Sequence, residues 1–85
     1  MNESISYYLG VTYDIWSSFD NKARVEENNK TIRLYSYETL VCEIKNNKAK
    51  VFNTYSNTTL RHIKEFLKQN NFKAENKKQI ERDYM

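Results

Sequence analysis

The hydrophobic positions of this chain change their period near residue 54. Between residues 11 and 54 apolar side chains alternate with polar ones, as in strands with one buried face. From residue 57 to 70 they recur every three or four positions, as on one face of a helix. The pattern predicts an α+β fold: an antiparallel meander of three or four strands over residues 11–54, one main helix at 57–70 and a short helix at 76–84.

Turns in this chain must be made without the usual residues, because it has one glycine and no proline. Asparagine is the next residue to tolerate a positive φ, and two pairs, Asn28-Asn29 and Asn46-Asn47, separate segments rich in Val, Ile and Leu. Each pair predicts a two-residue hairpin turn. Pairing outward from Asn46-Asn47 gives one apolar face, made by Leu40, Cys42, Ile44, Ala49 and Val51.

Pairing outward from Asn28-Asn29 sets Val25 opposite Ile32. The stretch TIRLYSYETLVCEI, residues 31–44, contains no favourable turn, so we predict one long strand, bent or bulged near residues 36–38 and shared by both hairpins. The segment VTYDIWSSF, residues 11–19, is predicted as a strand because its β-branched and aromatic residues prefer a pleated surface. Its apolar spacing also fits a helix, so both alternatives stay open.

The stretch TYSNTTLRHIKEF has the residues of a helix start. Ser56 is the expected N-cap, and Tyr55 and Leu60 then occupy the two positions of a hydrophobic staple. Asn70 or Asn71 is expected to end the helix in the left-handed conformation. The second helix is expected to begin with Asn76 as its cap, answered by Gln79, and to turn Ile80 and Tyr84 inward.

At about 100° per residue the main helix has an apolar face, a basic stripe and a histidine at the rim. The apolar face comprises Leu60, Ile63, Phe66 and Leu67. Arg61, Lys64 and Lys68 lie within about 60° of one another on the other flank. The stripe predicts either a solvated helix face or a contact to phosphate or acidic side chains, with Lys77 and Lys78 nearby in sequence.

Charge and cysteine content narrow the partners. The net charge is +3, and residues 31–85 carry eleven basic and six acidic groups, which favours polyanions or acidic protein surfaces. With one cysteine and one histidine the chain has no internal disulfide and no four-ligand nitrogen and sulfur metal set, so we expect no metal and no cofactor. It shows no signal segment and no membrane-spanning run, which predicts a cytoplasmic protein that does not enter a membrane.

The candidate chemistry does not favour an enzyme. A nucleophile and base pair would have to join Cys42 to His62, and Cys42 is expected on the buried face, where a thiol is inert. His62 is expected to be a structural histidine at the rim of the helix. The remaining catalytic alternative is a metal-independent ribonuclease-type toxin that uses His62 with Arg61 and Tyr55.

Nucleic-acid binding is the stronger alternative. Arg33, Tyr35 and Tyr37 are expected to project from one side of the long strand, and aromatics with arginine on a sheet face form a stacking platform for single strands. The same tyrosines would instead pack beneath the helix if it covers that face.

Two motifs carry a resemblance. They are Tyr-Ser-x-Thr-Thr-x-Arg-His-x-x-x-Phe, here residues 55–66, and a preceding Ser-Tyr-x-Thr-x-Val, here residues 36–41. In these, and over roughly residues 35–84, the chain resembles a group of small uncharacterised proteins encoded by bacteriophages, prophages and plasmids of low-GC Gram-positive bacteria. The resemblance implies a mobile-element origin and no catalytic residue.

The leading hypothesis is therefore a non-enzymatic phage or mobile-element protein that binds and inhibits a host nucleic-acid-processing or defence enzyme, as anti-CRISPR proteins do. Its expected partner is a host protein with an acidic surface or a nucleoprotein complex. The expected contact residues are Arg61, Lys64, Lys68, Lys77 and Lys78. A homodimer through an unprotected edge strand is a further expectation.

Overall fold

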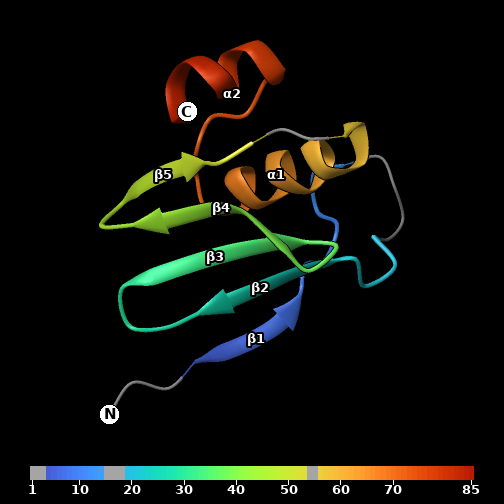
Figure 1. The fold of residues 1–85 in the computed structure, drawn as a ribbon, viewed down its shortest axis with the longest axis vertical. Coiled ribbons are helices and arrows are strands. Elements are labelled where there is room, and N and C mark those ends of the chain that lie inside the picture. Colours follow the sequence, from blue (N-terminus) through green and yellow to red (C-terminus); the bar gives the residue numbers. More distant parts are fainter. Residues whose placement is uncertain (1–3, 15–18, 54–55) are drawn as a thin grey trace.

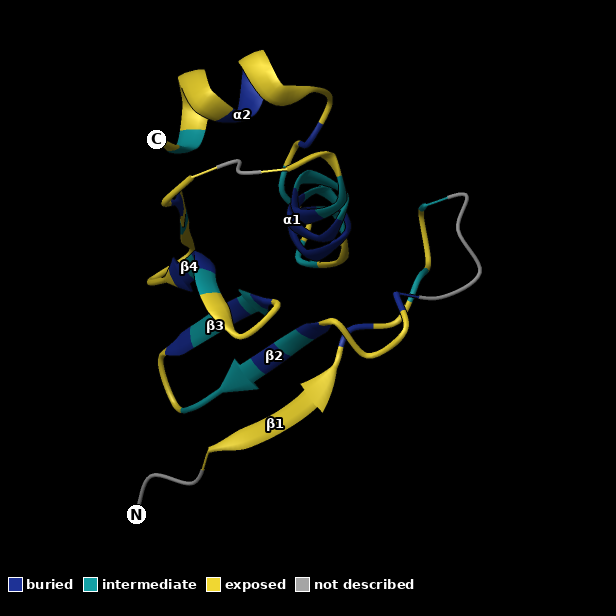
Figure 2. Ribbon diagram, turned by 45° about the vertical axis from the view of Figure 1, so that its right-hand side comes forward, coloured by how far each residue is buried: buried dark blue, intermediate teal, exposed yellow. Residues whose placement is uncertain are grey.

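The backbone forms one antiparallel sheet with two helices on the same side (Figures 1 and 2). The structure, a computed structural model, describes residues 4–14, 19–53 and 56–85. The elements are β1 (Ile5–Tyr8), β2 (Ala23–Glu27), β3 (Thr31–Ser36), β4 (Thr39–Lys45), β5 (Lys48–Val51), α1 (Asn57–Gln69) and α2 (Lys77–Tyr84). The five strands follow one another in sheet order, so the predicted α+β meander with a main helix and a short terminal helix is confirmed.

The turn at Asn46 and Asn47 forms as predicted. Both residues have positive φ, 53° and 62°, which is the geometry of a two-residue hairpin between right-twisted strands. Cys42 pairs with Val51 and Ile44 with Ala49, in the predicted register. Local turn chemistry is therefore sufficient to set this hairpin.

The register predicted for the hairpin at Asn28-Asn29 is wrong: the turn lies one residue later, and the strand pairing is therefore shifted by two residues. Val25 pairs with Leu34, not with Ile32. The Asn28 side chain accepts hydrogen bonds from the backbone N–H of Lys30 and of Thr31, at 3.3 and 3.1 Å. This side-chain turn closes the hairpin one residue later without a positive φ, and it leaves the apolar face of β2 unchanged.

The single long strand predicted over residues 31–44 is also wrong. Tyr37 and Glu38 adopt left-handed φ values of 51° and 66° and form a tight turn between β3 and β4. Both are residues that rarely accept this conformation, so the sequence indicated a bend near residues 36–38 but not a tight turn. Val41 is left opposite no residue of β3, and this bulge turns Val41 into the core and shifts Leu40 away from the predicted apolar face.

The N-terminal segment differs from the strand predicted over residues 11–19. Its described residues 11–14 are neither strand nor helix, and residues 15–18 lie outside the described residues. Asp20 and Asn21 take positive φ and lead into β2. The first strand is instead β1, which the hydrophobic pattern did not indicate because all four of its residues are exposed.

Both helices begin with the predicted caps, and α1 also ends at the predicted asparagines. The Ser56 side chain accepts from the N–H of Thr59, while the staple residue Tyr55 lies outside the described residues. At the far end Asn71 has a φ of 67°, and the N–H of Phe72 donates to the Leu67 carbonyl. In α2 the Asn76 side chain accepts from the N–H of Gln79.

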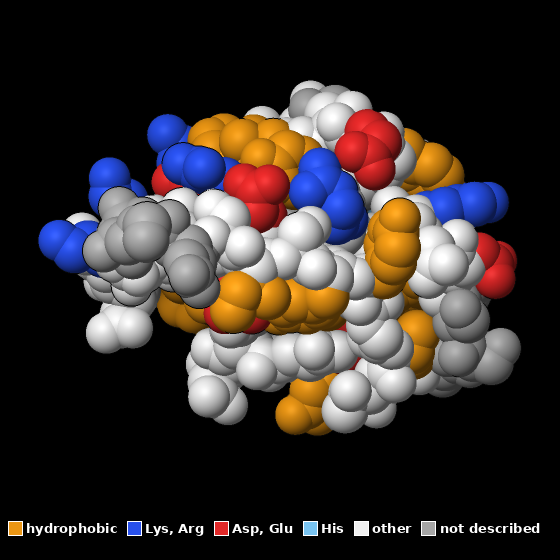
Figure 3. Space-filling view, turned by 90° about the horizontal axis from the view of Figure 1, so that it is seen from below, with side chains coloured by type: hydrophobic (Ala, Val, Ile, Leu, Met, Phe, Trp, Pro, Cys, Tyr) orange, Lys and Arg blue, Asp and Glu red, His pale blue; other side chains and the backbone are white. Residues whose placement is uncertain are grey.

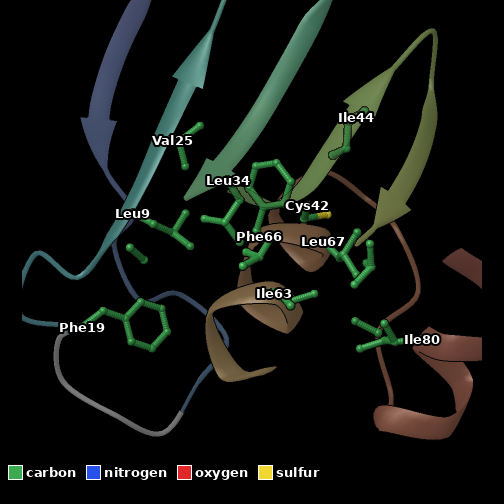
Figure 4. Close-up of a cluster of buried hydrophobic side chains, with 14 residues drawn as sticks. Leu9, Phe19, Val25, Leu34, Cys42, Ile44, Ile63, Phe66, Leu67 and Ile80 are labelled. Carbon is green, nitrogen blue, oxygen red and sulfur yellow. The ribbon is translucent and has the colours of Figure 1, made fainter. Parts of the chain in front are cut away.

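The core lies between the sheet and α1. Ile63, Phe66 and Leu67 are fully buried and face Leu34 and the rest of the sheet's apolar side chains (Figure 4). The short helix α2 packs beside β5 and adds Ile80 to the same cluster. Neither helix in the described part of the chain is long and apolar enough to cross a membrane.

Candidate functional site

A hollow of about 430 Å³ lies between α1 and the N-terminal segment 12–14. We call it the α1 hollow. It is lined by Tyr13, Asp14, Asn57, Leu60, Arg61, Lys64, Glu65 and Lys68. The hollow therefore brings the predicted basic stripe of α1 together with residues about fifty positions earlier in the chain.

One wall of the α1 hollow is held by a buried carboxylate. Glu65 is 1% exposed and accepts hydrogen bonds from the backbone N–H groups of Thr12, Tyr13 and Asp14, at 2.8 to 3.2 Å. The Gln69 side chain is a fourth donor, at 2.6 Å. A buried carboxylate is tolerated only when its oxygens are satisfied in this way, so Glu65 clamps segment 12–14 onto the helix.

Sequence periodicity does not reveal this clamp. Glu65 lies roughly 150° from the centre of the apolar face of α1, where an isolated helix would expose it. It is buried because the N-terminal segment covers that second side of α1. The sequence shows only that Glu65 shares one side of the helix with His62 and Gln69. It does not indicate which segment covers that side.

The cations of the α1 hollow have different environments. Arg61 donates to the Asp14 carboxylate at 2.9 Å, and Asp14 is in turn held through its own N–H by Glu65. Lys64 and Lys68 are half-buried, and within the described ranges their ammonium groups have no hydrogen bond or ion pair. Lys77 and Lys78, which the sequence grouped with this stripe, are exposed in the first turn of α2 and do not line the hollow.

A second polar cluster joins α1 to the sheet. The Ser36 hydroxyl lies 2.8 Å from His62 Nδ1 and 3.0 Å from the Thr59 hydroxyl. Ser36 and His62 are 2% and 1% exposed, and Phe19 packs edge-on against the imidazole at 4.6 Å. A serine and histidine pair at this distance resembles a nucleophile and its base, but burial shuts it off from a substrate, so we assign it a structural role.

The family of this chain is known by comparison. The chain belongs to the DUF8033 family, a family of unknown function. The match covers residues 7–82 and so includes both the α1 hollow and the buried polar cluster. No curated protein and no solved structure matches the DUF8033 chain.

The predicted stacking platform does not assemble on the sheet of the DUF8033 chain. Arg33 is ion-paired to Glu43 at 3.1 Å, and the ring of Tyr35 is covered by the guanidinium of Arg24 at 4.4 Å. Tyr37 does not share their face, because the turn places its ring 5.8 Å from His62. The expectation that the three project together is wrong for that reason.

Cys42 is buried on the helix-facing side of the sheet, as expected. Burial raises the pKa of its thiol to about 12. The thiol is therefore protonated near neutral pH and is a poor nucleophile. Within the described residues no three His, Cys, Asp or Glu side chains are placed to hold a metal ion.

The buried histidine makes the stability of the DUF8033 chain depend on pH. Burial lowers the pKa of His62, opposed by Asp14 and assisted by Lys22. The unfolded chain therefore takes up a proton near pH 6.5, before the folded chain does, and the free energy of unfolding falls as the pH drops below that value. His62→Gln removes this titration, so the stability difference between parent and variant is expected to narrow from pH 7.5 to pH 5.

Urea unfolding of both chains at several pH values measures that difference. Carboxylates titrate equally in parent and variant, so the comparison isolates the histidine. A stability difference that stays constant across this range would contradict the assignment of a neutral, buried His62.

Proposed function

We propose that the DUF8033 chain is a non-enzymatic binding protein that uses the α1 hollow to engage an acidic surface of a partner protein and thereby inhibits it. Lys64 and Lys68 carry the proposal, because they are cations held side by side with no ionic partner among the described residues. An acidic protein surface supplies the carboxylates that would pair with them. Tyr13, 57% exposed at the edge of the hollow, supplies an aromatic contact of the kind enriched in protein interfaces.

The rigidity of the α1 hollow supports binding. Glu65 holds the backbone of segment 12–14, and the ion pair from Arg61 holds Asp14. A site that is formed before its partner arrives loses less conformational entropy on binding. The two lysines therefore lie in a site whose backbone does not have to become ordered when a partner binds.

The open face of the sheet supports a protein partner over a nucleic acid. Its basic residues lie opposite carboxylates on the neighbouring strands: Glu26 lies opposite Arg33, and Glu43 lies opposite Lys50. Carboxylates among the cations repel a phosphate backbone and weaken its attraction. Direct nucleic-acid binding through Arg33 and Tyr35 would first have to break the ion pair and the ring contact that hold them.

The class of target follows from the sequence resemblance. Small proteins of phages and other mobile elements commonly act on one host protein, and we extend this to a host nucleic-acid-processing or defence enzyme by analogy. The charge argues against a mimic of DNA, since the chain is basic overall.

Charge reversal in the α1 hollow tests the proposal. The tagged chain is used to capture partners from host lysate, with and without nuclease treatment, beside a K64E/K68E double variant. We expect the captured protein to be lost from the variant, with its affinity lowered at least about tenfold.

K77E/K78E is the matched control, because it makes the same change in net charge on exposed lysines outside the hollow. Equal capture by all three chains would refute the α1 hollow as the contact. Recovery of nucleic acid alone, abolished by nuclease, would support the nucleic-acid alternative instead.

A further inference from the structure

The first strand is an edge that nothing in the described part of the chain covers. β1 pairs with β2 along one side only, and no described strand pairs with its other side. Ile5, Tyr7 and Tyr8 are 63%, 43% and 55% exposed, and Figure 2 shows the strand exposed along its whole length. Seen from this side, in Figure 3, hydrophobic side chains reach the surface of the molecule.

The backbone phase of β1 shows which groups face outward. The N–H of Leu9 donates to the Ala23 carbonyl at 2.7 Å, so odd-numbered residues turn their hydrogen-bonding groups toward β2. By alternation the N–H and C=O groups of Ser6 and Tyr8 point away from the sheet. They form the template that an added antiparallel strand would use.

The other edge strand, β5, is protected against pairing with another strand, whereas β1 is not. β5 has the sequence KAKV, and Lys48 and Lys50 would face like charges if this strand paired with its copy. β1 has the sequence ISYY, with no charge and no proline. A second copy of β1 therefore meets no like charge across the new pair.

We infer that two copies of this chain pair antiparallel through β1, around a two-fold axis at Ser6. A two-fold axis perpendicular to the sheet keeps the helices of both copies on one side, so paired residues share a face. Ser6 then lies opposite itself, with its outward N–H and C=O groups bonded to the same groups of the second copy. Ile5 lies opposite the partner's Tyr7, which puts an aliphatic and an aromatic side chain together on the helix side.

The pairing joins two five-stranded sheets into one continuous sheet and removes both exposed β1 edges. It also sets two copies of the α1 hollow on the same side of that sheet. The inference is independent of the proposed function, because it uses no residue of the hollow.

Sedimentation equilibrium of the full chain tests the pairing. The parent is expected to reach twice its 10.3 kDa mass as concentration rises. Ser6→Pro removes the central outward N–H and leaves the bonds to β2 intact, so it is expected to weaken the dimer at least about tenfold. Ser6→Thr keeps that N–H and is expected to dimerise like the parent.

A second variant and a second readout guard against misfolding of the proline variant. Ser6→Lys places two like charges at the axis and is expected to give a folded monomer, checked by circular dichroism. In the parent dimer the amides of Ser6 and Tyr8 should exchange more slowly as concentration rises, while that of Tyr7, already bonded to β2, should not change.

A parent that stays monomeric at every concentration would overturn the inference, whatever else binds β1. So would a Ser6→Lys chain that dimerises as tightly as the parent. The K64E/K68E variant is expected to dimerise normally, so failure of the pairing and failure of the proposed function are distinguishable.

Discussion

Replacing Glu65 by alanine is expected to lower the free energy of unfolding by about 3 to 5 kcal/mol. The change removes the acceptor for the N–H groups of Thr12, Tyr13 and Asp14, and for the Gln69 side chain. Each donor left buried without a partner costs about 1 to 3 kcal/mol, reduced where water reaches it. An 85-residue domain has little stability to spare, so the variant should be visibly destabilised in urea unfolding.

Glu75→Ala is the matched control for this prediction. This variant also loses a glutamate carboxylate. The ion pair that Glu75 makes with Lys73 is long, at 3.7 Å, and both side chains are 60% exposed. Surface pairs of this kind contribute little, so the control should stay within about 0.5 kcal/mol of the parent. In Glu65→Ala the amides of residues 12–14 should also exchange faster, and a variant as stable as the control would contradict the clamp.

Replacing Phe66 by alanine is expected to cost a similar amount, about 3 to 5 kcal/mol, for a different reason. Phe66 is 1% exposed and lies next to Glu65 in sequence, but it faces the sheet instead of the N-terminal segment (Figure 4). Truncation removes buried apolar surface and leaves a cavity between α1 and Leu34 that the packed core fills only in part.

Phe52→Ala provides the comparison for Phe66. Phe52 is 39% exposed on the open face of the sheet, beside the Lys50 ammonium. Its truncation should cost about 1 kcal/mol or less. Thermal unfolding of the two variants distinguishes them, and equal losses would mean that α1 does not pack on the sheet through Phe66.

Phe66 and Glu65 together hold the elements that form the α1 hollow. Phe66 fixes α1 to the sheet on one side, and Glu65 fixes segment 12–14 to α1 on another. Lys64 and Lys68 line the hollow from the third side, half-buried and without an ion pair among the described residues. The helix therefore carries core, clamp and binding surface on different faces.

The parts of the fold predicted from sequence are those set by local chemistry. The positive φ of Asn46 and Asn47 and the caps of both helices depend on residues within a few positions of one another. For that reason the hairpin at Asn46-Asn47 was correctly predicted, and the bounds of both helices were predicted to within one residue.

The parts that were missed are set by contacts distant in sequence. Tyr37 and Glu38 make a turn against their own preference, and the bond from Ser36 to His62 ties its base to α1. Glu65 is buried only because residues about fifty positions earlier lie over it. Sequence periodicity reports one buried face per helix, and α1 has two.

Lysine labelling of a captured complex shows directly whether the α1 hollow is the binding surface. The parent chain is treated with an amine-reactive reagent alone and in complex with its partner, and each modified lysine is quantified by mass spectrometry. We expect Lys64 and Lys68 to lose reactivity on binding, while Lys77 and Lys78 keep theirs. Unchanged labelling of Lys64 and Lys68 in a complex that is fully formed would contradict the α1 hollow as the binding surface.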